Sequence, residues 1–290
     1  MNLKDQIQSK LQRLNGAEKL IAINVACFVL PLFLKTLFFL FALPFDTFLG
    51  LFELSSDWSV FIFRPWSLVT YSFLHSGLFH LFWNMYLLYF SSRLILNLFP
   101  VKTFFNIYFL GVILGGITFL LSFSLFPALQ NSAPVMVGAS AGVMAVFIFM
   151  ATYSPEYRVQ LFLFSVKLWY LGLAFVLIDI IQIPSGNAGG HLAHLGGALL
   201  GYYYAKKLAQ GTDIGLPFER WVNRWVDLFR KKPTLRTVYR NTSNAAKKAV
   251  SKSQDDTQQK IDAILDKISD SGYESLTKEE KDILFKAGKK

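Results

Sequence analysis

Four side chains that could perform chemistry stand inside otherwise apolar stretches of the chain: His80, Asn84, Ser140 and His194. Polar groups within a membrane are costly, so each of them needs a structural or functional reason. A serine hydroxyl beside a neutral imidazole is a pairing used for nucleophilic catalysis, with the imidazole as the general base. Further hydrogen-bond donors nearby would stabilise negative charge that develops on a substrate oxygen.

The surroundings of Ser140 suit a nucleophile. It lies in a run of small residues, Gly138-Ala139-Ser140-Ala141-Gly142, near the expected start of a helix. Small neighbours leave the hydroxyl accessible, and the free N–H groups at a helix start can bind an oxyanion. His80 and Asn84 are four residues apart, so they share one face of a helix and can both donate to the same oxygen.

The four side chains are also expected at a similar depth. Counted at about 1.5 Å per helical residue from the turns at Gly77, Pro134 and Gly189, they lie about 4–10 Å inside their helices. Gly197 and Gly201 follow His194 and form a Gly-xxx-Gly pair, which allows two helices to approach closely. Such an approach would bring the imidazole of His194 to the hydroxyl of Ser140.

The composition places these residues in a membrane protein. Hydrophobic residues make up 53% of the 290 residues and charged ones only 17%, with a mean hydropathy of +0.39. The net charge of +10 belongs to the flanks, because residues 20–205 contribute +1, residues 1–19 contribute +2 and residues 206–290 contribute +7. Basic flanks indicate attraction to anionic lipid, so we expect no nucleic-acid partner. Cys27 is the only cysteine, which excludes an intrachain disulfide.

Apolar runs of spanning length predict six transmembrane helices at residues 20–38, 78–98, 104–126, 135–153, 166–183 and 190–205. The 127–134 and 184–189 loops carry no charge. Lys and Arg instead precede the first predicted helix, flank the turns between the second and third and between the fourth and fifth, and follow the sixth, which puts both termini on the cytoplasmic side. The exception is Lys35, near the outer end of the first helix, which we expect to snorkel to the interface. We therefore expect an all-α polytopic protein of a bacterial cell (inner) membrane. Its parts would be a cytoplasmic segment, 1–19, a membrane domain, 20–205, and a basic cytoplasmic helical tail, 206–290. Residues 1–16 are polar and do not resemble a cleavable signal peptide.

The tail is expected to hold short amphipathic helices. Residues 218–229 place Phe, Trp and Val on one face, which is typical of an interfacial helix. Residues 241–259 are polar and predict a linker. A second apolar stripe, from Ile261 to Ile268, is followed by Gly272 as a helix stop, and Thr277 with Glu280 predicts a capping box.

The chain resembles the rhomboid intramembrane serine proteases over residues 64–204. The stretches that carry the resemblance are Arg64-Pro65-Trp66, His75, His80-Leu81-Phe82-Trp83-Asn84, Gly138-Ala139-Ser140, and Ala193-His194-Leu195-Gly196-Gly197 with Gly201. The resemblance implies a six-helix rhomboid-like bundle and cleavage of transmembrane segments of other proteins. It implies that Ser140 is the nucleophile and His194 its base, without an acidic third member. His80, Asn84 and the Ser140 N–H would form the oxyanion hole.

The chain departs from the family pattern at three positions. Ala141 follows the serine where the family usually has glycine, Ser67 follows Trp66 where arginine is common, and Met144 stands where an aromatic residue often packs on the catalytic histidine. These departures concern the fine geometry of the site and leave the reactive groups in place.

The same residues also allow interpretations that involve no serine-protease chemistry. Ser140 could simply bond back to the carbonyl four residues earlier, although the matched depth of His194 argues against it. His191 could join His194, His75 and His80 in a metal site, but no cysteine is near them, and we expect neither a metal nor another cofactor. Asp179, near the end of its helix, could tune the site or gate access, but we favour a hydrogen-bonded acid at the interface.

Two other functions compete with the protease. A catalytically inactive rhomboid-like scaffold would hold membrane proteins without cutting them, and the presence of both Ser140 and His194 argues against it. A small transporter would show more ionisable residues at the midplane and an internal repeat, and we find neither in the sequence. The expected partners are therefore transmembrane protein substrates and the lipid bilayer, with anionic lipid at the tail.

Overall fold

The computed structural model describes residues 2, 5, 6, 9, 12–161, 164–229 and 244–287. The chain divides into two compact units, Met1–Arg230 and Lys231–Lys290. The predicted reactive residues all lie in the first unit.

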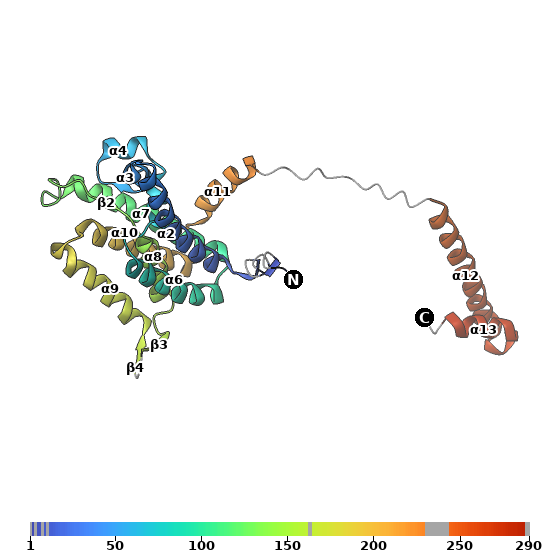
Figure 1. Cartoon of the computed structure of the whole chain (residues 1–290). Helices are drawn as coiled ribbons and strands as arrows, with labels where there is room; N and C mark the ends of the chain where they lie inside the picture. The colour runs from blue at the N-terminus through green and yellow to red at the C-terminus, as the bar shows by residue number, and fades with distance from the viewer. Residues whose placement is uncertain are drawn as a thin grey trace. The chain divides into compact units, whose positions relative to one another are not determined.

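Helices dominate the first unit (Figure 1). The longer ones are α2 (Gly16–Leu40), α6 (Leu78–Leu98), α7 (Val101–Leu125), α8 (Ser140–Tyr153), α9 (Leu168–Gln182), α10 (Ala188–Ala209) and α11 (Leu216–Phe229). The short ones are α3 (Phe45–Leu49), α4 (Trp58–Phe63), α5 (Ser67–Thr70), η1 (Tyr71–Phe73) and η2 (Ile183–Ser185). Strand β1 (Leu54–Ser55) pairs antiparallel with β2 (Val135–Met136), and β3 (Arg158–Leu161) pairs with β4 (Phe164–Lys167).

The mostly helical membrane fold is confirmed, whereas the count of six spans stays a prediction. Three described helices, Gly16–Leu40, Val101–Leu125 and Leu168–Ser185, are long and apolar enough to cross a membrane by length and composition. Helix α8 is apolar but has only 14 residues. Helices α6 and α10 have 21 and 22 residues, and they carry the polar groups discussed below.

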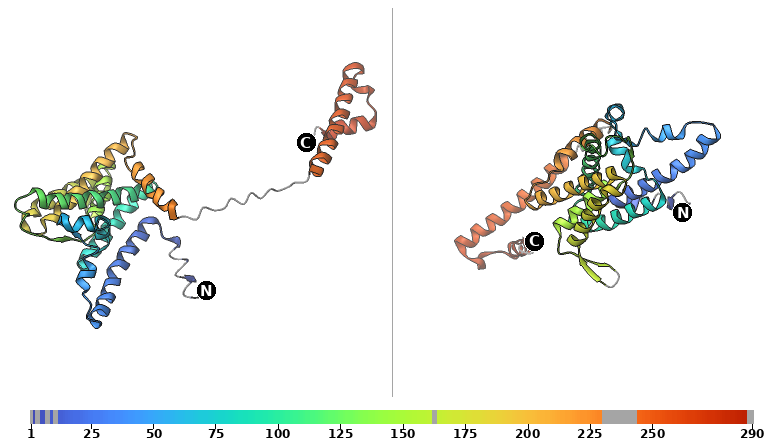
Figure 2. Two further views of the ribbon diagram at one scale, coloured as in Figure 1. Left: turned by 90° about the horizontal axis from the view of Figure 1, so that it is seen from above. Right: turned by 90° about the vertical axis from the view of Figure 1, so that its left-hand side faces the viewer.

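Two predicted helices begin later than expected. The stretch 135–153 is helical only from Ser140, because Val135 and Met136 pair with β1 and Gly138 has a φ of 130°. The N–H of Gly138 donates to the carbonyl of Tyr71 at 3.0 Å, which holds the chain just before the helix. The stretch 166–183 is helical only from Leu168, because residues 166 and 167 belong to the β3–β4 hairpin. The figures show that hairpin at the start of α9 (Figures 1 and 2).

Helix α8 lies at the centre of the unit, against α6, α7, α9 and α10 (Figure 1). Residues 141–151 are all buried, as expected for a helix that is apolar on every face. The approach of α10 is so close that a Cβ on Gly197 or Gly201 would overlap the carbonyl oxygens of Ala141 and Ala145. The Gly-xxx-Gly pair therefore brings the backbones of α8 and α10 into direct contact, as predicted.

The compact unit continues beyond the predicted membrane domain at 20–205. The Tyr204 hydroxyl donates to Asp213, and Gly215 packs against Tyr204 and Asn106. Lys102 at the start of α7 forms an ion pair with Glu219 of α11. These contacts tie α11 to the same unit as the reactive residues.

The second unit contains α12 (Asn244–Ser271), η3 (Tyr273–Ser275) and α13 (Lys278–Ala287). The predicted linker at 241–259 is wrong for residues 244–259, which form the first half of α12, and residues 241–243 lie outside the described part of the chain. Gly272, with a φ of 77°, follows the end of α12 as predicted. The capping box is confirmed, because Thr277 and Glu280 each accept a hydrogen bond from the other's backbone N–H.

Candidate active site

The four predicted reactive residues line one pocket of about 350 Å³ in the first unit. We call it the Ser140 pocket. His80 and Asn84 come from α6, Ser140 from α8 and His194 from α10. The remaining lining is mostly apolar and comes from α6, α8 and α9, with one further polar residue, Asp179. Segments far apart in the sequence thus converge on one small site, as the matched depths predict.

Ser140 is the first residue of α8, and local structure exposes its hydroxyl to the pocket. The N-cap residue, Ala139, has no side-chain oxygen to cap the helix, so the first-turn N–H groups keep their hydrogen-bonding capacity. A Cβ built on Gly138 would lie 2.9 Å from Nε2 of His80 and 3.6 Å from Oγ of Ser140. Gly138 therefore leaves open the space that His80 and Ser140 share, and its φ of 130° also favours glycine.

His80 and Asn84 are held by local hydrogen bonds. Nδ1 of His80 is 3.0 Å from the hydroxyl of Ser76, so Nε2 is the nitrogen that faces Gly138. The Asn84 side chain is buried and donates to the carbonyl of His80 at 2.9 Å. One amide hydrogen of Asn84 is used in this way, which leaves the other for a ligand. Both residues can therefore offer a donor to an oxygen bound near Ser140.

His194 is oriented by Asp179, for which the sequence favoured a hydrogen-bonded acid at the interface over a residue that tunes the site. Its Nδ1 is 2.8 Å from Oδ1 of Asp179, and Nδ1 of His191 is 2.7 Å from the same oxygen. Asp179 lies on α9 and is only 6% exposed. The expectation of a hydrogen-bonded acid was right, but its partners are the proposed base and its neighbour. Within the described residues, no hydrogen bond joins the Ser140 hydroxyl to His194.

Asp179, His191 and His194 are also the described residues best placed to hold a metal ion, since their ligand atoms lie within 4.8 Å of one another. Three protein ligands of these types can form a zinc site with one open position. Here the Nδ1 atoms of both histidines lie at hydrogen-bond distance from the carboxylate of Asp179. If each Nδ1 carries a hydrogen, it donates to that carboxylate, and the arrangement needs no metal. His75 lies apart from this group, with its ring 5.2 Å from that of His80.

The three departures from the family pattern are accommodated inside the fold. Met144 is buried and lines the Ser140 pocket, where its flexible side chain fills space. The carbonyl of Ala141 faces Gly197 of α10. Ser67 is buried in α5, while the preceding Trp66 donates to the carbonyl of Leu51.

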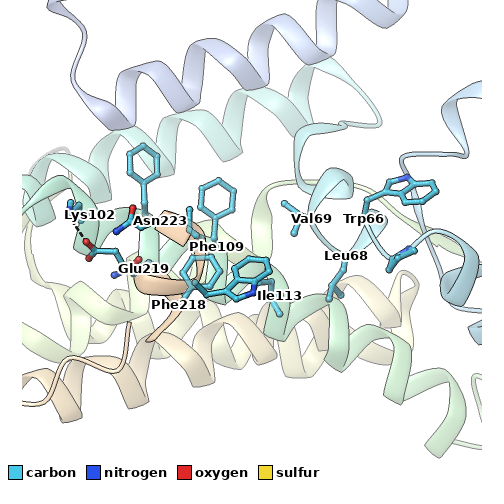
Figure 3. A pocket seen from close by; sticks show the side chains of 14 residues that line it. Trp66, Leu68, Val69, Lys102, Phe109, Ile113, Phe218, Glu219 and Asn223 are labelled. Carbon is cyan, nitrogen blue, oxygen red and sulfur yellow. Dashed lines mark hydrogen bonds and ion pairs between the residues drawn. The ribbon is translucent and has the colours of Figure 1, made fainter. Parts of the chain in front are cut away.

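A larger pocket, of about 800 Å³, lies elsewhere on the same unit. Figure 3 shows it along α7, with Phe109 and Ile113 on that helix and Phe218 on α11. The Lys102–Glu219 ion pair closes one end. This lining holds no serine, cysteine or histidine, so its size does not make it a catalytic site.

Comparison with known proteins agrees with these features. A family model for the Rhomboid domain matches residues 63–211, and a model described as a family of unknown function (DUF6576) matches residues 248–290. Presenilin-associated rhomboid-like protein A, mitochondrial, of Danio rerio is 33% identical over 141 residues, covering 47% of this chain and 36% of that protein. The Homo sapiens and Mus musculus presenilin-associated rhomboid-like proteins, mitochondrial, are 31% and 32% identical over 144 residues, covering 48% of this chain and 36% and 37% of their own lengths.

The chain spans only about 36% of the length of the Danio rerio relative, so the activity of that whole protein does not transfer directly. These relatives are named as mitochondrial proteins, which conflicts with the expected location of this chain in a bacterial inner membrane. The family match and the apolar helices together identify this chain as a membrane protein.

Proposed function

The chain belongs to the rhomboid family, and on that premise we propose that it is an intramembrane serine endopeptidase that cuts transmembrane segments with Ser140 and His194. The observation that carries the proposal is the convergence of His80, Asn84, Ser140 and His194 on one pocket. A nucleophile, a base and donors for an oxyanion are the groups that acyl transfer needs.

The proposed reaction has two steps. The hydroxyl oxygen of Ser140 attacks the carbonyl carbon of the substrate while His194 takes the hydroxyl proton through Nε2. The carbonyl oxygen becomes negative and is held by the Ser140 N–H, His80 and Asn84. His194 then gives its proton to the leaving amine, and an acyl-enzyme forms. Water, deprotonated by His194, releases the second product and restores Ser140.

A substrate helix has to unwind before this attack, because its carbonyls are otherwise bonded within the helix. We therefore expect transmembrane segments with small or helix-breaking residues near the end that enters the pocket. The apolar residues of the pocket, such as Trp83 on α6 and Phe175 on α9, suit such a segment. We also propose that both termini lie on the same side of the membrane.

The lipid bilayer is the second proposed partner, with anionic lipid at the basic tail. Residues 218–252 hold ten Lys or Arg against two acids, although residues 230–243 lie outside the described part of the chain. In α11, Trp221 and Trp225 are 57% and 53% exposed, as suits aromatic anchors at the headgroup level. Attraction of this kind contributes about 1 kcal/mol for each basic residue near an anionic surface.

The competing function is a catalytically inactive rhomboid-like scaffold. It is favoured by the absence, among the described residues, of a hydrogen bond between Ser140 and His194. Catalytic hydrogen bonds are often long in a free enzyme and shorten when substrate binds, so the resting geometry is compatible with both functions. A reaction with an active-site probe separates them.

The test is labelling of the purified protein with a fluorophosphonate probe, together with cleavage of a transmembrane substrate in detergent. Ser140→Ala should abolish both while the protein still folds, and His194→Ala should be as severe because the two residues act as one unit. Ser122→Ala is the matched control, since this buried hydroxyl donates to the carbonyl of Phe119 in its own helix, α7, and lies outside the Ser140 pocket. Labelling of Ser140→Ala at the wild-type level would exclude the proposed nucleophile, and an unlabelled wild type would favour the scaffold.

A further inference from the structure

A single carboxylate on α9 holds two imidazoles of α10. Oδ1 of Asp179 is 2.7 Å from Nδ1 of His191 and 2.8 Å from Nδ1 of His194. The Asp179 side chain is 9% exposed, and those of His191 and His194 are 14% and 22% exposed. The cluster is therefore largely shielded from water, and hydrogen bonds in such surroundings are stronger than at a surface.

These contacts define which nitrogen of His194 carries hydrogen. An ionised carboxylate can only accept hydrogen bonds, so Nδ1 of His194 is the donor. In the neutral ring the other nitrogen, Nε2, then has a free lone pair. A base that removes the Ser140 proton needs that lone pair, and the opposite tautomer would place a hydrogen on Nε2.

We propose that Asp179 is a positioning residue that fixes the Nδ1–H tautomer and the ring orientation of His194. The inference rests on the proposed function, because it assigns Asp179 a role in preparing the proposed base. It also adds an acidic member to a site in which the family resemblance implies only a serine and a histidine. Asp179 itself does not touch the reacting atoms, and it acts through His194.

The negative charge has a second effect on the same step. When His194 accepts the Ser140 proton it becomes an imidazolium, and a carboxylate 2.8 Å away stabilises that cation. Among the described residues, His80 on α6 is a second titratable group that lines the same pocket as His194, and its positive form would oppose the imidazolium. On its own helix His191 shares the carboxylate, and α8 contributes the uncharged Ser140. From α7, the uncharged Thr118 lies against Gly196, two residues after His194.

The competing explanation is that Asp179 only fastens α9 to α10. Both roles predict that Asp179→Asn destabilises the protein, so a melting temperature alone cannot separate them. A fastening role leaves the pH dependence of catalysis unchanged, whereas a positioning role changes it. Asp213→Asn is a matched control, because Asp213 also accepts hydrogen bonds, from the Tyr204 hydroxyl and the Gly215 N–H, but lies outside the Ser140 pocket.

The kinetic experiment measures kcat and KM for transmembrane-substrate cleavage from pH 5 to 10 in detergent. Asp179→Asn should lower kcat by at least about tenfold and up to about 10⁴-fold, with a smaller change in KM. The acid limb of its pH profile should move to lower pH, because the variant no longer stabilises the imidazolium. Asp179→Glu should recover part of the rate and of the pH profile. Asp213→Asn should keep the wild-type profile. A wild-type profile in Asp179→Asn would overturn the proposal.

A measurement that needs no activity keeps this inference separate from the proposed function. The chain has only four histidines, so nitrogen-15 NMR of the histidine-labelled Ser140→Ala protein can report each tautomer. His194, assigned by its loss in His194→Gln, should be the Nδ1–H form, and Asp179→Asn should shift it towards Nε2–H. An Nε2–H tautomer with Asp179 intact would overturn the inference even if the enzyme cuts substrates. If His194 is the Nδ1–H form but the wild-type protein never reacts with the fluorophosphonate probe, the proposed protease activity is excluded while the positioning contact of Asp179 is retained.

Discussion

At the scale of single residues, His80 and Asn84 provide the first prediction. Both line the Ser140 pocket from α6, and neither is the nucleophile or the base of the proposed mechanism. His80→Ala and Asn84→Ala should each lower kcat by about 10²–10³-fold, because each removes one oxyanion donor. Probe labelling should persist at a reduced rate, in contrast to Ser140→Ala. Wild-type turnover in either variant would remove that residue from the oxyanion hole.

His75 provides a prediction about pH and stability. Burial, with a smaller contribution from the charge on His80, lowers the pKa of His75 to about 4. In the unfolded chain, His75 has its ordinary, higher pKa. Below about pH 6.5 the unfolded chain therefore binds a proton that the folded protein does not, and stability falls as pH drops towards 4. The loss at pH 5 should be about 2 kcal/mol. Thermal unfolding in detergent should show a weaker acid destabilisation for His75→Gln than for the wild type.

The residues also show what the sequence can and cannot predict about the site. Ser140, His194, His80 and Asn84 could be grouped because depth along a helix follows from a residue count. The contact between Asp179 and His194 could not, because it depends on how α9 rotates about its axis against α10. The spacing of His191 and His194 on one helix face was visible, but nothing in it selected Asp179 as their common partner.

At the scale of helices, the crossing of α8 and α10 sets the distance between the proposed nucleophile and base. Gly197→Ala should separate these helices, because its Cβ would overlap the carbonyl oxygen of Ala141. We expect a loss of about 1–3 kcal/mol in stability and, if the helices separate by about 1 Å, about 10²-fold in kcat. The measurements are thermal unfolding and cleavage rate. Gly77→Ala is the control, since nothing lies within 4 Å of its Cβ position.

Helix boundaries were less predictable than helix existence. Apolar periodicity placed α6 at 78–98, where it is found, because no other structure competes for those residues. The start of α8 was placed five residues early, because Val135 and Met136 pair with a strand some 80 residues away in the sequence. A single sequence does not reveal that one two-residue strand pairs with another far away in the chain. The late start of α8, after Gly138, therefore depends on tertiary structure.

At the scale of the whole molecule, the boundary between the two units predicts where the chain can be shortened. A chain that ends after residue 230 should keep the melting temperature and the detergent activity of the full protein, because the first compact unit remains whole. A chain that ends after Leu208 loses Asp213, Gly215 and Glu219, which contact Tyr204, Asn106 and Lys102. Its melting temperature should drop by about 5–10 °C. Equal melting temperatures for the two truncations would show that α11 does not support the fold.

The amino-acid composition was enough to predict a helical membrane protein, but it does not determine how many helices span the membrane. Helix α6 carries a histidine, two asparagines and an arginine, and α10 carries two histidines, two lysines and several glycines, so hydropathy alone does not mark them as spans. Three of these polar residues, His80, Asn84 and His194, line the proposed site. The features that make the sequence functionally informative therefore weaken the topological signal.

The direct contact between α8 and α10 has a consequence for biosynthesis. A ribosome makes Ser140 before His194, and the 54 residues from Ala141 to His194 take about 3–10 s at 5–20 residues per second. During that time α8 lacks the neighbour whose backbone covers Ala141 and Ala145. On the proposed mechanism the nascent chain carries its nucleophile but no base. The insertion machinery and its other client helices are then protected from cleavage until the last helix of the bundle has entered the membrane.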